Sequence, residues 1–276
     1  MRIYLTMFLP RTLLAACAML VVANCASAVT ANDSKAVPRI YAHRGGDWAP
    51  ENTMAAFKKC VENGVYGVEL DIQRCKSGEL IVIHDVDVKR TAGGGSDLVK
   101  DMTWDQLKGL DAGAWFSPEF KGERIPLLSE VLDAVGEKLV INIEIKNTPV
   151  AYPGIDEDLI KVLKNYKHKD KIVISSFDHE VLKRIHAKEP GLKLGFLMCG
   201  LPADLPAYAK ELGTTAWHPD LGSVRPDALK SAQSAGVEVN VWTLNSKDDW
   251  DKASKMHVDG IITDDPVAVA AFLKGR

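Results

Sequence analysis

Short runs of apolar and β-branched residues alternate with longer amphipathic segments along most of the chain. The runs that predict strands are Ile40–His43, Val68–Ile72, Val140–Ile145, Ile172–Ser175, Leu194–Leu197, Thr214–Trp217, Val237–Trp242 and Gly260–Thr263. The segments with helical spacing include Asp156–Tyr166, Glu180–His186, Leu205–Leu212, Pro226–Ala235 and Lys247–Met256. About eight strand–helix units in roughly 250 residues predict an α/β fold of the TIM (β/α)8 barrel type. A doubly wound open sheet is the alternative, because periodicity cannot show that a sheet closes.

One further apolar run breaks this alternation. Leu80–His84 has the pattern of a strand, but it follows the second strand after only a few residues, among them Ser77-Gly78. A parallel crossover needs a dozen or more residues, so these two strands must form a hairpin. A turn centred on Ser77-Gly78 sets His84 opposite Asp71, and we expect this histidine to fold back toward the mouth of the barrel.

The chain then passes through a stretch of about 86–126 that is rich in glycine and contains Trp104, Trp115, Phe116 and Phe120. We interpret this stretch as an insertion in a βα loop that follows the hairpin. Such loops lie at the catalytic end of a barrel, so the insertion is expected to form a cap over the site. For most of its aromatic residues we expect packing in a small core of the insertion itself instead.

The first 28 residues have the pattern of an export signal. A basic start is followed by an apolar run over Thr12–Ala23 and by the small residues Ala26-Ser27-Ala28. The run is shorter than the roughly 20 apolar residues that a membrane span needs, so we expect cleavage and no stable membrane insertion. The mature chain, residues 29–276, is then a single periplasmic or secreted domain. An uncleaved anchor and a lipoprotein cleavage site at Cys25 are the weaker alternatives.

The net charge of the chain limits the kinds of molecule that it is predicted to bind. Without its first 28 residues the chain has 32 basic residues (34 less two arginines) against 37 acidic ones, a net charge of −5. No lysine or arginine cluster stands clear of acids, so nucleic acid is not a predicted partner.

The mature chain keeps Cys60, Cys75 and Cys199. A Cys60–Cys75 disulfide and three buried free thiols are both compatible with the sequence.

Polar side chains recur where the predicted strands end, which is where a TIM barrel has its active site. Glu69 and Asp71 are two residues apart on the second strand, so they face the same side. Glu144 and Lys146 repeat this spacing on the next parallel strand. Carboxylate oxygens suit magnesium or calcium, so the three acids are predicted to bind a divalent cation. The alternative is structural, with a buried ion pair on one strand and backbone hydrogen bonds to the acids of the other, but buried pairs contribute little to stability.

Two histidines lie close to these acids in the predicted fold. His43 ends the first strand and His84 ends the hairpin. Imidazoles titrate near neutrality, so one of them can take a proton from a nucleophile while the other gives a proton to a leaving alkoxide. The cation, Arg44 and Lys146 can neutralise a phosphodiester. These groups predict the cleavage of a phosphate ester, with His43 as base and His84 as acid, and the reverse assignment remains open.

The order of several short motifs resembles the glycerophosphodiester phosphodiesterase family. The motifs are His43-Arg44-Gly45, Pro50-Glu51-Asn52-Thr53, Glu69-Leu70-Asp71, His84-Asp85, Leu110-Asp111-Ala112-Gly113 with Trp115-Phe116, Ile125-Pro126, Ile143-Glu144-Ile145-Lys146 and Trp242-Thr243. Each motif is weak alone, but together they run in order from about Ile40 to the last predicted strand. The resemblance implies a TIM barrel with an inserted cap and the hydrolysis of glycerophosphodiesters to sn-glycerol 3-phosphate and an alcohol.

The resemblance also implies roles for particular residues. The three acids hold calcium or magnesium, the two histidines are the acid–base pair, and Arg44 and Lys146 contact phosphate. Trp242, at the end of the seventh predicted strand, and Phe177, which follows Ser175-Ser176, are candidates to flank the glycerol, with core packing as the alternative for each. Asn52 or Thr53 is expected to cap the first helix. The competing functions are a lysophospholipase D or sphingomyelinase-like phosphodiesterase on the same scaffold, or a protein that binds phosphodiesters without cleaving them.

Overall fold

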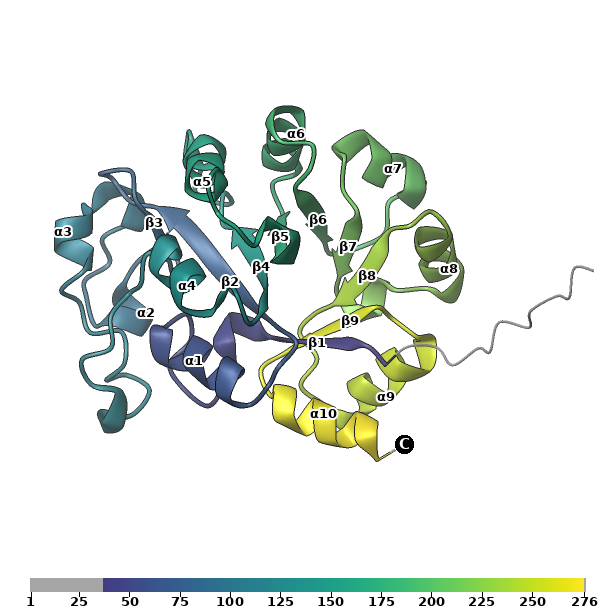
Figure 1. Ribbon diagram of the computed structural model, residues 1–276, viewed down its shortest axis with the longest axis horizontal. Coiled ribbons are helices and arrows are strands. Elements are labelled where there is room, and N and C mark those ends of the chain that lie inside the picture. The colour runs from purple at the N-terminus through teal and green to yellow at the C-terminus, as the bar shows by residue number, and fades with distance from the viewer. Residues whose placement is uncertain (1–36, 276) are drawn as a thin grey trace, which may run out of the picture. The chain divides into compact units, whose positions relative to one another are not determined.

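Eight parallel strands close into a barrel in the computed structural model, which describes residues 37–275 (Figure 1). The strands are β1 (Arg39–Ala42), β2 (Gly67–Arg74), β4 (Val140–Ile145), β5 (Ile172–Ser176), β6 (Lys193–Met198), β7 (Ala216–Pro219), β8 (Glu238–Val241) and β9 (Gly260–Thr263). β1 pairs in parallel with both β2 and β9, and these two pairings close the sheet. The predicted TIM barrel is therefore confirmed and the open sheet is excluded. The predicted export signal lies outside the described residues.

Helices surround the barrel as an outer ring (Figure 1). They are α1 (Met54–Glu62), α4 (Leu128–Val135), α5 (Ile155–Leu163), α6 (His179–Lys188), α7 (Leu205–Leu212), α8 (Pro226–Ser234), α9 (Lys247–Met256) and α10 (Pro266–Lys274). Thr53 caps α1, because its side chain accepts a hydrogen bond from the backbone of Ala56. Asn52 is not the cap: its backbone has a φ of 57° and its side chain turns toward the strands. None of the described helices is both long and apolar enough to cross a bilayer.

The hairpin after β2 is present, but its register differs by one residue from the prediction. β3 (Leu80–Val82) pairs antiparallel with β2, and the backbone of Ile83 donates to the carbonyl of Asp71. Gly78, at a φ of 105°, allows a turn of three residues closed by a hydrogen bond from Cys75 to Glu79. The predicted turn had one residue fewer between its paired positions. Ile83 therefore lies opposite Asp71, where the sequence placed His84.

The segment 86–126 contains the short helices α2 (Lys89–Ala92) and α3 (Trp104–Leu107) and has a hydrophobic core of its own. That core includes Val88, Val99, Leu107 and Ile125, and Trp104 packs against it. Trp115 and Phe116, in contrast, keep 40% and 39% of their surface exposed. The prediction that most of these aromatic residues fill the insertion's own core therefore fails for this adjacent pair.

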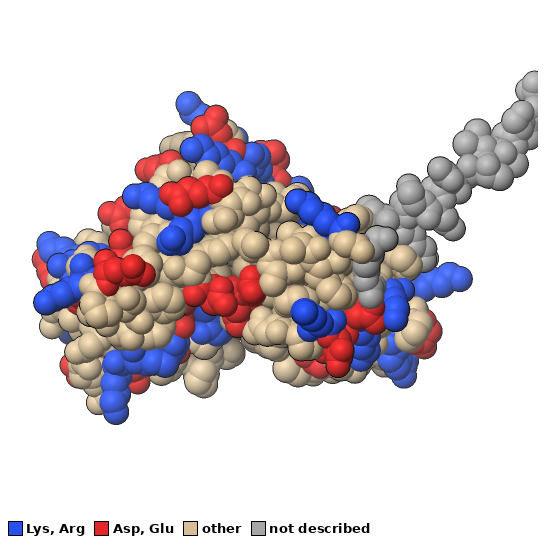
Figure 2. All heavy atoms as spheres, turned by 90° about the horizontal axis from the view of Figure 1, so that it is seen from below, with Lys and Arg blue, Asp and Glu red and all other residues tan. Residues whose placement is uncertain are grey.

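The main core lies between the barrel and its helices. From β2, Val68, Leu70 and Ile72 point outward into it, and Cys60 of α1 joins them. Cys75 belongs to the small core of the insertion, and both thiols are free, so the structure has no Cys60–Cys75 disulfide. Seen from the side of α1 and α10, lysine, arginine and acidic side chains are interspersed over the described surface (Figure 2).

Candidate active site

Three acids meet at the carboxyl ends of β2 and β4. The register pairs Glu69 with Asn142 and Asp71 with Glu144, so these side chains share the interior of the barrel. Each of the three acids contributes one carboxylate oxygen, and these oxygens lie within 4.8 Å of one another. The cluster that was predicted from alternate positions on two strands is therefore present in the fold.

Burial and mutual repulsion disfavour the ionised form of two of the three acids. Burial, followed by the negative charge of Asp71, raises the pKa of Glu69 from 4.5 to about 8 and the pKa of Glu144 to about 7. Oε1 of Glu69 is buried and has no hydrogen-bond partner among the described residues. A set of hard oxygen donors with one buried oxygen unbonded fits a divalent cation of the calcium or magnesium type.

Asp71 is the member of the cluster that stays ionised. Nδ2 of Asn52 donates to its carboxylate at 2.8 Å, and two cations face it, Nε of Arg44 at 3.5 Å and Nζ of Lys146 at 3.7 Å. Burial alone raises the pKa of Asp71, but Lys146 and then Arg44 outweigh burial and lower it. Lys146 also donates to Glu144 at 2.8 Å, so its ammonium group bridges two of the three acids.

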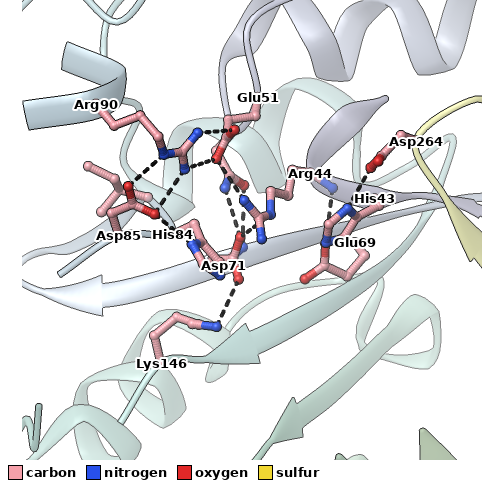
Figure 3. A network of polar contacts seen from close by, with 12 residues as sticks. His43, Arg44, Glu51, Glu69, Asp71, His84, Asp85, Arg90, Lys146 and Asp264 are labelled. Carbon is pink, nitrogen blue, oxygen red and sulfur yellow. Dashed lines mark hydrogen bonds and ion pairs between the residues drawn. The ribbon is translucent and has the colours of Figure 1, made fainter. Parts of the chain in front are cut away.

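His43 is held by a carboxylate from the far end of the chain. Its Nδ1 lies 2.6 Å from Oδ1 of Asp264, which follows β9 (Figure 3). Nδ2 of Asn245 donates to the other oxygen of Asp264 at 2.6 Å and fixes that carboxylate. Burial by itself lowers the pKa of His43, but the bond to Asp264 and the charge of Glu69 outweigh it and raise the pKa. With Nδ1 engaged by Asp264, Nε2 is the nitrogen left for proton transfer.

His84 has a carboxylate partner of its own. Its Nδ1 lies 2.8 Å from Oδ1 of Asp85, and Arg90 donates to both oxygens of Asp85 at 2.6 and 2.9 Å. Burial, which outweighs the opposing charge of Asp71, lowers the pKa of His84. The two histidines are therefore each oriented through Nδ1 while their pKa values move in opposite directions.

A chain of ion pairs connects the insertion with the loop after β1 (Figure 3). Arg90 of α2 donates to both oxygens of Glu51 at 2.7 and 2.8 Å, and Arg44 donates to the same carboxylate at 3.0 Å. Because Arg90 also donates hydrogen bonds to Asp85, the partner of His84, it links that carboxylate to the carboxylate that pairs with Arg44. Paired guanidinium–carboxylate contacts of this kind fix orientation as well as charge.

The loop that carries His43 and Arg44 has an unusual backbone. Arg44 has a φ of 51°, and its N–H donates to Glu69 at 3.0 Å. Gly45 follows at a φ of 93°, and a Cβ there would lie 2.6 Å from the Cβ of Ala56. The glycine of the His43-Arg44-Gly45 motif is therefore required both by its backbone conformation and by the close approach of α1.

A cavity of about 130 Å³ lies over the acids. It is lined by His43, Arg44, Glu69, His84, Asn142, Glu144, Lys146, Phe177, Leu197, Trp242, Thr243 and Ile262. The rings of Phe177 and Trp242 meet edge to face with centroids 5.6 Å apart, and Nε1 of Trp242 donates to the carbonyl of His218. One side of the cavity therefore has two imidazoles, two cationic side chains and carboxylates, and two aromatic rings form another part of its wall.

The sequence matches the model of the glycerophosphoryl diester phosphodiesterase family over residues 43–268, which include every polar group described above. The chain belongs to this family. A glycerophosphodiester phosphodiesterase from Caldanaerobacter subterraneus is 44% identical over 230 residues, which cover 82% of this chain and 94% of the relative. Family membership makes the protein a phosphodiesterase.

Solved structures of other phosphodiesterases of this kind have the same fold. A phosphodiesterase from Oleispira antarctica in complex with the product sn-glycerol-3-phosphate aligns with a TM-score of 0.79 at 26% identity, covering 86% of this chain and 97% of that one. A glycerophosphodiester phosphodiesterase from Thermotoga maritima aligns with a TM-score of 0.68 at 30% identity, covering 87% and 98%.

The nine residues predicted for the site lie together at this end of the phosphodiesterase barrel. The positioning roles of four residues were not predicted: Asn52, Asp85, Arg90 and Asp264. Asn52 and Asp85 lie inside motifs that carried the family resemblance, so a signal was present for them. Asp264 directly follows a strand, which is the position expected of a site residue in a barrel. Arg90 lies on a short helix of the insertion, where no periodicity marked it.

Proposed function

We propose that the protein hydrolyses glycerophosphodiesters to sn-glycerol 3-phosphate and an alcohol, with a divalent cation and two histidines. The observation that carries the proposal is the pair of imidazoles, each held by a carboxylate at Nδ1, that line one cavity with the acid cluster. The names of the Caldanaerobacter relative and of the Oleispira complex support the substrate class.

Glu69, Asp71 and Glu144 are the proposed ligands of the cation, which is calcium or magnesium. When bound, the cation supplies positive charge that neutralises the phosphodiester and its transition state. Arg44 and Lys146 line the same cavity and contact the phosphate oxygens. Both side chains already neutralise Asp71, so they are fixed in place before the substrate binds.

His43 is the proposed base and His84 the proposed acid. The raised pKa of His43 makes it the better proton acceptor, and the lowered pKa of His84 makes it the better donor. Nε2 of His43 takes the proton of the nucleophile, which is either water or the glycerol hydroxyl next to the phosphate. In the second case the attack gives a cyclic phosphodiester, which water then opens to sn-glycerol 3-phosphate. Nε2 of His84 gives a proton to the leaving alkoxide. In each case the carboxylate at Nδ1 holds the ring and stabilises the imidazolium form.

The aromatic wall and the insertion complete the proposed site. Phe177 and Trp242 flank the glycerol, whose carbon atoms pack against their rings. The insertion 86–126 acts as a cap, because its Trp115 and Phe116 line a second cavity that also contains His43 and Arg44. The cap would hold bulk water away from the reacting phosphate.

We also propose that residues 1–28 direct export, so that the mature chain, 29–276, works as one domain in the periplasm or outside the cell. The basic start, short apolar run and small residues before Val29 support this. Intact mass measurement of the protein recovered from its native host tests the proposal. A mature chain that starts near Val29 is expected, and a chain that retains residue 1 would contradict it.

Replacing the histidines tests the proposed chemistry. His43→Ala and His84→Ala should each reduce turnover of glycerophosphocholine by about 100- to 10,000-fold, which is the usual contribution of general acid–base catalysis. His257→Ala is the matched control, because this histidine is exposed at the end of α9 and should keep full activity. Unchanged turnover in either of the first two variants would contradict the proposal. Faster turnover of a lysophospholipid than of the deacylated diester would favour the competing lysophospholipase D function.

A further inference from the structure

A second and larger cavity adjoins the catalytic one. It has a volume of about 490 Å³ and shares His43 and Arg44 with the smaller cavity over the acids. Its walls come from the loop after β1, the insertion, the segment after β8 and the loop after β9. A diester whose glycerol phosphate fills the smaller cavity still has a head group to place, and this space opens from the same two residues.

The second cavity carries an excess of negative charge. Its two basic residues are already neutralised, since Arg44 pairs with Glu51 and His43 with Asp264. Asp47 and Asp265 also line the cavity, and neither has an ion-pair partner among the described residues. The side chain of Asp265 caps α10 by accepting a hydrogen bond from the backbone of Ala268, and the lining as a whole has four carboxylates against two basic groups. Burial, followed by the charge of Asp265, raises the pKa of Asp47.

Aromatic rings form the opposite wall of this cavity. Trp115 and Phe116 are among the few large apolar side chains of the described chain that remain exposed, and their rings meet at 5.8 Å. Trp250 is buried and adds a third ring to the lining. Arg90 lies 5.9 Å from the ring centre of Trp115, whereas no cation of the described residues lies over the ring of Phe116. Aromatic faces beside carboxylates are the usual receptor for ammonium groups.

We propose that this cavity binds a positively charged head group, so that the preferred substrates are glycerophosphodiesters of amino alcohols. The ammonium group lies between the carboxylates of Asp47 and Asp265 and the ring of Phe116, while the phosphate stays with Arg44 and Lys146 in the catalytic cavity. This inference rests on the proposed function and adds the class of the leaving alcohol. The two charges of a zwitterionic diester would then lie in two neighbouring cavities.

A selectivity ratio tests the proposal. The ratio is kcat/KM for glycerophosphocholine divided by kcat/KM for glycerophosphoglycerol, which has the same phosphate and an uncharged head group. The wild-type ratio should be about ten, and Asp47→Asn and Phe116→Leu should each lower it by roughly three- to tenfold, as expected for one partly exposed charge or cation–π contact. Phe116→Leu keeps an apolar side chain, so a lower ratio reports the loss of the aromatic face.

The matched control is Asp248→Asn, which removes one negative charge from the exposed start of α9, outside the cavity lining. This variant should keep the wild-type ratio, whereas a fall equal to that of Asp47→Asn would assign the effect to overall charge and overturn the proposal. Efficient hydrolysis of both esters with a ratio near one would overturn it while leaving the proposed function intact. Hydrolysis of neither ester would contradict the proposed function itself. Thermal unfolding of each variant confirms that Asp47 and Phe116, both exposed, are not needed for folding.

Discussion

Nδ1 of His43 and Oδ1 of Asp264 lie 2.6 Å apart although 221 residues separate them in the sequence. The contact joins the first and last strands of the barrel, which pair with each other to close the sheet. The pairing that closes the barrel therefore also brings Asp264 to the imidazole that it orients. A chain that did not close its barrel could not place this imidazole.

Replacing Asp264 by asparagine should impair catalysis and lower the pKa of His43. Asparagine keeps the size of the side chain but removes the charge that favours the imidazolium form, so we expect kcat to fall by roughly 10- to 1,000-fold. The imidazole pKa, followed by NMR in metal-free protein, should decrease because the bond to Asp264 raises it in the wild type. Asp227→Asn, at the exposed start of α8, is the control. An unchanged kcat and an unchanged pKa would show that Asp264 has no positioning role.

Arg90 is expected to act through Glu51 and Asp85, because it makes four hydrogen bonds of 2.6–2.9 Å to these two carboxylates. Arg90→Met should lower kcat by about tenfold or more, because Arg44 and His84 lose their fixed partners. Arg90→Lys should give an intermediate kcat, since one ammonium group cannot make the paired hydrogen bonds that a guanidinium group makes to two carboxylates.

Steady-state kinetics at a fixed cation concentration measure the effect of Arg90. Arg225→Met is the matched control, because Arg225 is exposed and pairs only with the neighbouring acid of α8 among the described residues. A purely structural role would lower the melting temperature and leave kcat of the folded fraction at the wild-type value. That result would show that Arg90 stabilises the fold and does not position Arg44 or His84 for catalysis.

The strand pattern of this chain was sufficient to predict most of its architecture. Val140–Ile145 and Gly260–Thr263 were predicted with the bounds that β4 and β9 have, because β-branched residues recur along both segments. The hairpin was predicted from the length of its connection, but its register was one residue wrong. Register depended on whether the turn had two or three residues, and Gly78 at positive φ permits the longer one.

The candidate site was predicted where the chemistry lies on strands and missed where it lies on loops. Glu69, Asp71 and Glu144 follow from alternation along two strands that prove to be neighbours. Arg90 and Asp264 come from segments whose positions depend on the fold of the insertion and on closure of the barrel. No local pattern encodes these two distances, so neither histidine had a predicted carboxylate partner.

Metal-free protein should lose stability as the pH rises. The pKa values of Glu69 and Glu144 are raised in the fold, so the folded state holds these protons more tightly than the unfolded chain does. Their contribution to the free energy of unfolding is therefore fully present below the ordinary value of 4.5 and is lost as the pH rises through about 7 and 8.

Added calcium or magnesium should reverse this loss, because a cation replaces the protons on the cluster. Thermal unfolding with and without cation should show an increase in the melting temperature on the order of 5 °C at pH 8.5 and a smaller one at pH 5.5. Glu69→Gln should abolish most of the difference between the two pH values. An increase of equal size at both pH values would argue against cation binding at this cluster.

Turnover of glycerophosphocholine by protein stripped of cations with a chelator, then supplied with calcium or magnesium, tests the central claim most directly. The predicted result is no release of choline or sn-glycerol 3-phosphate without cation, recovery with at least one of the two ions, and no recovery in Glu144→Gln at the same ion concentration. Full turnover in the chelated protein, or equal recovery in Glu144→Gln, would contradict the claim that the acid cluster holds a cation needed for diester hydrolysis.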